Sequence, residues 1–302
     1  MRIALLSAFP IFEGSVGGAE LSDYAMMREG FQRGHTIVQV APQAVRPEEH
    51  DVSIVANFRT AMGHPVWPHS AMLEATQRVP TVFYVHDVPY CHHQLHYPMQ
   101  PKCLACPNGD KTRTLLESAA LCVFLSPLHV ERLAKSQPWI EQLPRHLTPS
   151  PIDVEHYRDR QSLRVPGTVL GVNALLQFKG AANVLEYVKE HPELQFTFVG
   201  GTHIEPSELP RHAVYLGGRL PSQMPDLYSQ SEAYIALPST LDPFSRSIAE
   251  ARLCGVKRFV RNENIGACSY PQWGLKDEAE FVEWIAEAPV RFWEAIEKEV
   301  GV

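Results

Sequence analysis

The sequence has no uninterrupted apolar run of the roughly 18 residues that a membrane-spanning helix needs, because His, Arg, Glu or Pro interrupts every apolar stretch. Its opening, MRIALLSAFP, also lacks the basic segment and the small-residue cleavage site of a secretory signal. We expect this opening to form the first strand of the fold. These absences favour a soluble, cytoplasmic protein with at most peripheral membrane contact.

Basic residues are in the minority, with 27 Lys and Arg against 34 Asp and Glu and a formal net charge of -7. This balance argues against nonspecific binding to nucleic acid as the main role. In a reducing compartment, the six cysteines are more often metal ligands or redox groups than disulfides. With 45% hydrophobic residues and no low-complexity segment, the 302 residues favour two compact domains of about 150 residues each.

Short β-branched or apolar runs alternate with helical patterns along the whole chain, which is typical of parallel α/β sheets wound on both faces. We expect two Rossmann-like domains, residues 1–150 and 151–302, because four prolines within Gln137–Pro151 exclude a continuous helix there. The apolar spacing of Asp277–Val302 predicts helices that are compatible with packing back on the first domain. The expected strands are Ile3–Ala8, Thr36–Ala41, Val52–Ala56, Thr81–His86, Leu121–Leu125, Thr168–Val172, Gln195–Val199, Ala213–Leu216, Ala233–Ala236 and Lys257–Val260. The expected helices before the tail are Ala19–Arg33, Val66–Gln77, Pro127–Ser136, Ala181–Glu190, Ser222–Ser231 and Phe244–Cys254.

One segment of the second half combines an expected strand end with a helix start suited to an anion. Asp242 is a good N-cap residue and Pro243 suits the first helical position, so the next backbone amides would face a diphosphate. Those amides belong to Phe244, Ser245 and Arg246. Glu250 lies eight residues beyond Asp242, or about 12 Å along a helix. One carboxylate would then bind sugar hydroxyls and the other ribose hydroxyls; the alternative is an ordinary capped helix with a surface glutamate.

This segment resembles the signature of the retaining GT-B glycosyltransferases, in which an acidic residue, Pro, Phe, Gly and four variable residues precede Glu-Ala. The resemblance implies that Glu250 binds the ribose diol of a nucleotide-sugar donor and that Asp242 binds the transferred sugar near the reacting centre. The chain departs from the signature twice, with Asp242 where Glu is usual and Ser245 where Gly is usual. These departures leave open which sugar is bound and how the phosphate approaches.

Three further motifs match the same family in order. Gly17 and Gly18 stand in a Gly-Gly-Ala-Glu motif, where the family's backbone approaches its ligand. Lys179 stands in a Lys-Gly motif and would neutralise the donor phosphates. His86 resembles the histidine that approaches the donor sugar from the N-terminal domain. Each has a simpler alternative: a turn, a solvated surface lysine, and a loop-capping histidine.

The family usually pairs this lysine with an arginine five residues earlier, but Ala174 occupies that position here. Half of the usual cationic clamp is therefore missing. Either Arg246 or Arg219 substitutes for the arginine, or the donor is bound with lower affinity.

A cysteine- and histidine-rich segment follows His86 and predicts a structural zinc site. Cys91, Cys103 and Cys106 would supply three ligands, and His96 is chosen as the fourth over His92 and His93 for its reach. Free thiols or a redox pair are the alternatives. The resemblance implies that glycosyl transfer itself requires no metal.

The resemblance implies transfer of a hexosyl or pentosyl group, with retention, from a UDP- or GDP-sugar to an acceptor hydroxyl. Cell-envelope glycans or lipid-linked sugars are the default acceptors. A modified DNA base is a minority hypothesis, motivated by the basic and His-rich stretch His86–Arg113 and weakened by the net charge. The alternatives from other classes are a non-catalytic nucleotide-sugar-binding or scaffold protein and a sugar-nucleotide epimerase of GT-B fold.

Overall fold

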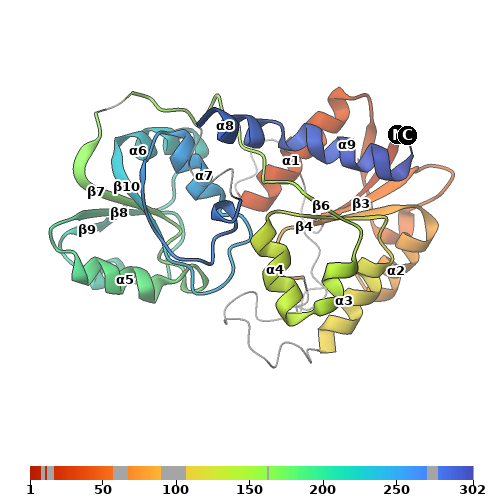
Figure 1. Cartoon of the computed structure of the whole chain (residues 1–302), viewed down its shortest axis with the longest axis horizontal. Helices are drawn as coiled ribbons and strands as arrows, with labels where there is room; N and C mark the ends of the chain where they lie inside the picture. The colour runs from red at the N-terminus through yellow and green to blue at the C-terminus, as the bar shows by residue number, and fades with distance from the viewer. Residues whose placement is uncertain are drawn as a thin grey trace. The chain divides into compact units, whose positions relative to one another are not determined.

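The computed structural model describes residues 1–7, 11, 17–56, 67–89, 107–161, 163–270 and 278–301, and the chain divides into two compact units (Figure 1). Unit 1 contains the described residues between Met1 and Pro151 together with those from Glu283 onward. Unit 2 contains the described residues between Ile152 and Val282. Each unit has its own parallel sheet.

The sheet of unit 1 has six described strands in the order β2-β1-β3-β4-β5-β6, and all neighbouring pairs are parallel. Every residue of β3, β4 and β5 is buried, as expected for strands that are covered on both faces. The chain runs outward from β1 to β2 and then returns to β3 on the other side of β1, so the strand order reverses there. The strands are β1 (Arg2–Ser7), β2 (Thr36–Gln39), β3 (Val52–Ala56), β4 (Thr81–Val85), β5 (Leu121–Phe124) and β6 (Arg145–Leu147).

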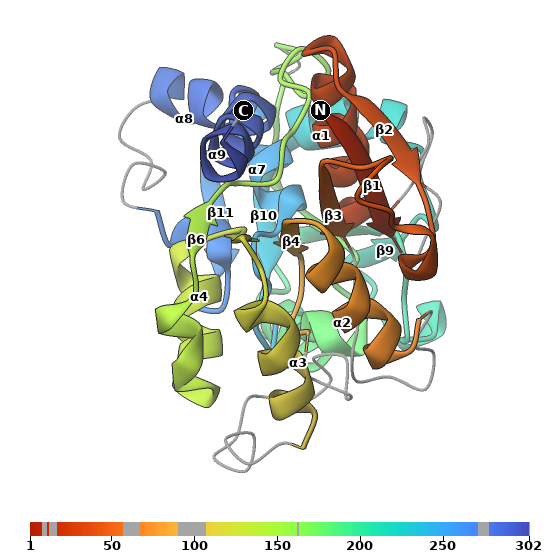
Figure 2. The same cartoon turned by 90° about the vertical axis from the view of Figure 1, so that its right-hand side faces the viewer.

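Helices cover both faces of this sheet (Figure 2). Helices α1 and α9 lie on one face, and α2, α3 and α4 lie on the other. This split follows from right-handed crossovers, because β1 leads to β2 in one direction and β3 leads to β4, β5 and β6 in the other. The helices are α1 (Gly18–Gln32), α2 (His69–Arg78), α3 (Pro107–Glu117), α4 (Pro127–Ser136) and α9 (Ala288–Val300).

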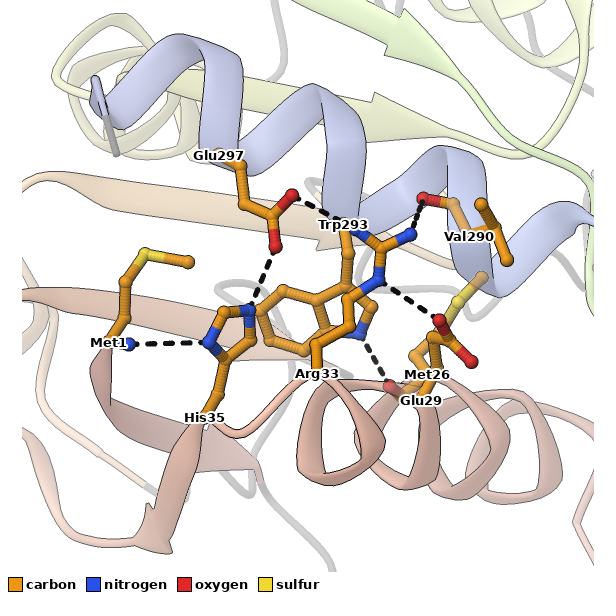
Figure 3. Close-up of polar contacts among 8 residues, drawn as sticks. All are labelled: Met1, Met26, Glu29, Arg33, His35, Val290, Trp293 and Glu297. Carbon is orange, nitrogen blue, oxygen red and sulfur yellow. Dashed lines mark hydrogen bonds and ion pairs between the residues drawn. The ribbon is translucent and has the colours of Figure 1, made fainter.

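The C-terminal helix α9 packs against α1 within unit 1 (Figure 3). The fully buried Trp293 donates its indole N–H to the Met26 carbonyl at 2.7 Å. Gly30 of α1 makes room for this ring, because a Cβ there would lie 2.4 Å from the Trp293 side chain. At the rim, Arg33 pairs with Glu297 at 2.9 Å. One large aromatic side chain therefore anchors the last helix to the first.

The sheet of unit 2 has five described strands in the order β11-β10-β7-β8-β9, again all parallel. Helix α5 covers one face, and α6 and α7 cover the other (Figure 1). The strands are β7 (Val165–Val172), β8 (Gln195–Val199), β9 (Ala213–Tyr215), β10 (Ser231–Ala236) and β11 (Arg258–Arg261). The helices are α5 (Ala181–Glu190), α6 (Met224–Gln230) and α7 (Arg246–Leu253); α8 (Glu278–Ala286) spans the junction of the two units in sequence.

The predicted fold class, two α/β units with parallel sheets, is confirmed. Some elements were not expected. Among them are helix α3, which begins at Pro107, and two elements of the proline-rich segment between the expected domains, a 3-10 helix at Pro138–Gln142 and strand β6. Within the described residues, no helix has both the length and the apolar character to cross a membrane.

Candidate functional site

The strand order of unit 2 reverses between β7 and β10, which are hydrogen-bonded neighbours. From β7 the chain proceeds through β8 and β9 on one side, and then returns to β10 and β11 on the other. Ligands of open parallel sheets bind beyond the carboxyl ends of the strands at such a switch point. The residues that follow β7 and β10 are therefore the first candidates for a binding site.

Two predicted site residues meet at this point. The Lys179 ammonium, in the 3-10 helix after β7, lies 2.7 Å from a carboxylate oxygen of Asp242, in the loop after β10. Their side chains are 32% and 11% exposed, so a ligand from solvent can reach the pair. Helix α5, which begins two residues after Lys179, is tied to the loop after β10, since Asn183 donates its side-chain N–H to the Leu237 carbonyl at 3.1 Å. The sequence predicted both residues but not their contact.

The glycine after Lys179 is required by the backbone. Gly180 has φ of 83°, in the left-handed region that favours glycine, and it caps α5. A Cβ at this position would lie 1.9 Å from the Leu237 carbonyl oxygen. Gly180 therefore allows the loops after β7 and β10 to approach each other, which brings Lys179 to Asp242.

The prediction that Asp242 caps the following helix is wrong. Helix α7 begins at Arg246, and its N-cap is Ser245, not Asp242. The Asp242 N–H donates to the Asn264 carbonyl at 2.8 Å, and the Asp242 carbonyl accepts from Gly266 at 2.9 Å. This pairing with the segment after β11 holds Asp242 in an extended bridge, so it cannot start a helix.

Ser245, where the resembled signature usually has glycine, lies in the turn into α7. Ser245 has φ of 64°, which places a non-glycine residue in the left-handed region. Phe244 is buried, and its carbonyl accepts from the Ala267 N–H at 2.8 Å. The segment 242–246 is thus a bridged loop followed by a short helix, rather than a helix from residue 244.

Glu250 lies in a buried polar environment on α7. One of its oxygens accepts from the Tyr228 hydroxyl at 3.0 Å, and the other lies 3.5 Å from the Arg246 guanidinium. Burial raises the pKa of the Glu250 carboxyl, although the charge of Arg246 and the hydrogen bond from Tyr228 oppose the rise. Two carboxylate oxygens offer about four acceptor positions, so these two partners leave acceptor capacity for a ligand.

The two arginines that were considered as substitutes for the missing clamp residue have other partners. Arg246 pairs with Glu250, and Arg219 donates to carbonyls of its own loop, including that of Gly218 at 2.9 Å. Ala174, in the usual arginine position, is buried in the apolar core of unit 2. Position 174 is therefore a packing position in this chain.

In unit 1, the predicted Gly17-Gly18 motif forms the start of α1. Gly17 is the N-cap, and a Cβ there would lie 1.9 Å from a carboxylate oxygen of Glu20. The Gly18 carbonyl accepts a hydrogen bond from the Ser22 hydroxyl at 2.9 Å. Glycine at position 17 thus lets the Glu20 side chain fold back over the first turn.

His86 lies directly after β4 and is buried. It is hydrogen-bonded to Asp23, a residue that the sequence motifs did not identify. Its Nε2 lies 2.7 Å from a carboxylate oxygen of Asp23 on α1, and their side chains are 5% and 0% exposed. Burial alone would lower the pKa of His86, but the charge and hydrogen bond of Asp23, with the charges of Asp87 and Glu20, raise it. Asp23 is therefore the main addition that the structure makes to the predicted site residues.

The predicted zinc ligands Cys91, His96, Cys103 and Cys106 lie outside the described residues. Within the described ranges, no group of three or more His, Cys, Asp or Glu side chains is arranged to hold a metal ion. The described cysteines, Cys122, Cys254 and Cys268, are free thiols.

No protein-family model matches the chain, and no curated protein matches it in sequence. Solved structures do match its fold over nearly the whole length. HepE from Anabaena, in complex with UDP and glucose, is 14% identical with a TM-score of 0.63, and the match covers 100% of both chains. Sucrose-phosphate synthase from Thermosynechococcus elongatus is 13% identical with a TM-score of 0.65, covering 99% of this chain and 94% of that one.

A third similar structure is an alpha-glucosyltransferase in complex with UDP and a 13-mer DNA that contains an HMU base. It is 12% identical with a TM-score of 0.57, and the match covers 100% of this chain and 94% of the other. At these identities the likeness concerns the fold alone. The chain therefore has the two-domain GT-B fold of these glycosyltransferases.

Proposed function

We propose that the chain is a retaining glycosyltransferase that transfers a hexosyl or pentosyl group from a UDP- or GDP-sugar to an acceptor hydroxyl. The observation that carries this proposal is the contact between Lys179 and Asp242 at the switch point of unit 2, with Glu250 on the helix that follows. A cation and two carboxylates beyond these strand ends suit a ligand with a diphosphate between a sugar and a ribose. The full-length likeness to glycosyltransferase structures that hold UDP supports the same ligand class.

Each residue in unit 2 has a distinct role in this proposal. The Lys179 ammonium moves from Asp242 to the donor phosphates and stabilises the charge of the departing diphosphate. Asp242 then binds hydroxyls of the transferred sugar, and Glu250 accepts from the ribose diol. The backbone amides at Phe244, Ser245 and Arg246 provide further hydrogen-bond donors to the phosphates.

In unit 1, Gly17 and Gly18 let the backbone approach the ligand, and His86 donates to the sugar. The acceptor oxygen forms a bond to the anomeric carbon while the bond from that carbon to the phosphate oxygen breaks. The proton of the acceptor hydroxyl passes to the departing diphosphate, so no protein nucleophile and no metal are needed for transfer. Positioning and charge stabilisation carry the catalysis.

For the acceptor we propose a cell-envelope glycan or a lipid-linked sugar. A modified DNA base is the second candidate, because one structure of the same fold, matched over 94% of its chain, holds DNA with an HMU base. Retention of the protein on DNA only at very low salt would count against this second acceptor, since phosphate contacts weaken steeply with salt.

A screen of nucleotide sugars by thermal shift, followed by hydrolysis assays, tests the proposed activity. A ligand at a hundred times its dissociation constant stabilises the folded state by about 2.7 kcal/mol. We expect one UDP- or GDP-sugar to stabilise the protein and to be hydrolysed slowly, with retention of the anomeric configuration. Binding without hydrolysis or transfer would favour a non-catalytic protein, and release of a free epimer would favour an epimerase.

We also propose a structural zinc ion held by Cys91, His96, Cys103 and Cys106. Three thiols and an imidazole are a ligand set that suits tetrahedral zinc. Elemental analysis of protein purified without added metal should give one equivalent of zinc per chain, which is lost in the double variant Cys103→Ser and Cys106→Ser. Less than about a tenth of an equivalent in well-folded protein would contradict the site.

A further inference from the structure

The contact between His86 and Asp23 joins two elements that are far apart in the sequence. Asp23 lies on the second turn of α1, and His86 is the first residue after β4. The two side chains approach to 2.7 Å, and Asp23 has no solvent exposure. The histidine ring also packs on Tyr84, with 4.2 Å between the ring centroids. The ring of His86 is therefore held by contacts with two elements, α1 and β4.

Asp23 occupies a position where helix packing favours an apolar residue. Together with Met26, Met27 and Gly30 it forms the buried stripe of α1, at the spacing of one helical face. A carboxylate without solvent costs several kcal/mol unless it is paired, and a well-packed apolar side chain is often as stable as a buried ion pair. Stability alone therefore gives little reason for an aspartate at position 23.

The groups around His86 carry more negative than positive charge. Three carboxylates raise the pKa of His86: Asp23 and Glu20 from α1, and Asp87 from the loop after β4. The neighbouring His129 on α4 has a lowered pKa, to which the positive charge of His86 contributes. His129 is buried, and its Nε2 lies 3.0 Å from the Asp87 carbonyl oxygen. Burial lowers the pKa of His129 to about 4, so this neighbour is neutral at physiological pH. The carboxylates consequently favour the protonated form of His86.

A protonated imidazole donates from both ring nitrogens. Since Nε2 is committed to Asp23, Nδ1 is the nitrogen that remains for a ligand oxygen. A charged donor forms a stronger hydrogen bond than a neutral one, to a sugar hydroxyl or to a phosphate oxygen. The protonated His86 ring is therefore suited to a ligand with oxygen acceptors, and Nδ1 is the nitrogen that would donate to it.

We propose that Asp23 is a positioning residue that orients His86 and keeps its ring positively charged, so that Nδ1 donates to the sugar end of the donor. This inference rests on the proposed glycosyltransferase function. Asp23 itself does not touch the substrate and acts only through the histidine.

The experiment compares Asp23→Asn and Asp23→Val with the wild type in the full chain, with Asp51→Asn as a matched control. Asp51 also pairs with a cation in unit 1, Arg2 at 2.6 Å, but it is an exposed surface residue. Three quantities are measured: donor hydrolysis as kcat and KM over pH, thermal unfolding, and the titration of His86 by NMR of its imidazole signals.

We expect both Asp23 variants to lower kcat roughly 10- to 100-fold, with a smaller change in KM, because a hydrogen bond from a charged group is lost or weakened. The pKa of His86 and the alkaline limb of the pH-rate profile should shift together to lower pH. Asp23→Val should remain folded, because a valine suits the apolar stripe of α1. Asp51→Asn should match the wild type in all three measurements.

The inference is overturned if the Asp23 variants retain the kcat, the pH profile and the His86 titration of the wild type. It is also overturned if activity falls only in proportion to lost folded protein. A wild type that neither binds nor hydrolyses any nucleotide sugar contradicts the proposed function instead. In that case the NMR titration still decides whether Asp23 controls the charge of His86.

Discussion

Both units hold a carboxylate paired with a cation near the carboxyl end of a parallel sheet, but the two pairs differ in burial. Lys179 and Asp242 in unit 2 are 32% and 11% exposed, whereas His86 and Asp23 in unit 1 are 5% and 0% exposed. A partly exposed pair exchanges partners readily, because solvent and ligand compensate each charge. A buried pair keeps its partners, since separating the charges leaves one of them uncompensated.

This difference in burial suits the two ion pairs to different functions. The pair in unit 2 is suited to open when an anionic ligand arrives, and the lysine then binds phosphate. The pair in unit 1 is suited to hold one side chain in a fixed orientation.

The largest effect should follow from removing Lys179, the cation of the partly exposed pair in unit 2. Lys179→Met should lower kcat for donor hydrolysis by about 100- to 1,000-fold, the usual loss when a group that stabilises transition-state charge is removed. The free energy of unfolding should change by less than about 1 kcal/mol, because a partly exposed ion pair contributes little. Lys189→Met, on the exposed face of α5, is the matched control. Equal activities of the two variants would exclude Lys179 from the site.

Next in size is the loss of stability from crowding the turn after Lys179. Gly180→Ala adds a Cβ that clashes with the Leu237 carbonyl in the left-handed region, and should cost about 3 kcal/mol of folding free energy. Gly217 also has a left-handed φ of 75°, but a Cβ there would meet nothing within 4 Å. Gly217→Ala should therefore cost only about 1 kcal/mol of folding free energy. Urea denaturation of the two variants measures the difference. Equal losses would mean that the loops after β7 and β10 are not held together as described.

The stability of unit 1 should depend on pH through two histidines with opposite signs. Burial lowers the pKa of His129 to about 4, below its ordinary value of 6.5. Its stabilising contribution is therefore present above pH 6.5 and is lost as the pH falls toward 4, by at most about 3 kcal/mol. His86 has a raised pKa, so its contribution is present below pH 6.5 and is lost as the pH rises through its folded value.

The variant His129→Gln separates these two contributions. It should flatten the pH dependence of the unfolding free energy between pH 4 and 6.5 and leave the change above pH 6.5 in place. Unfolding by urea at a series of pH values measures both regions. An unchanged acid limb in His129→Gln would show that another group causes the loss of stability.

The smallest effect concerns the turn before α7. Ser245→Gly should stabilise unit 2 by about 1 kcal/mol, because glycine adopts the left-handed region without the steric cost of a Cβ. The backbone amide at position 245 is retained, so binding of a nucleoside diphosphate should not change. A loss of binding in this variant would indicate that the serine hydroxyl, and not the backbone, contacts the ligand.

The sequence predicted the fold because alternation of apolar strands with helices is a strong signal, and it is confirmed by the two parallel sheets. The exceptions have local causes. Pro107-Asn108-Gly109 is typical of a loop but forms the start of α3, and β6 is a short edge strand that lies between Pro144 and Pro149. Propensities of single residues did not indicate that packing against the sheet would order these segments.

Part of the candidate site was also predictable. Motif spacing identified Lys179, Asp242 and Glu250, but contact between loops after β7 and β10 depends on strand order, which spacing does not give. Asp23 was missed because nothing in the sequence pairs it with His86. The available signal was a carboxylate in the apolar stripe of α1, which helix periodicity alone can detect.

The proposed function places the donor in unit 2, with Glu250 at the nucleoside and Asp242 at the sugar. Calorimetry of Glu250→Gln and Asp242→Asn, with the free nucleoside diphosphate and with the intact donor, tests this placement most directly. Glu250→Gln should weaken both ligands by about 1.5–3 kcal/mol, the range for a hydrogen bond to a charged group. Asp242→Asn should lower turnover without weakening the free diphosphate, because the Asp242 carboxylate competes with phosphate for Lys179. Equal effects of the two variants on the free diphosphate, or no effect of either on turnover, would contradict the account.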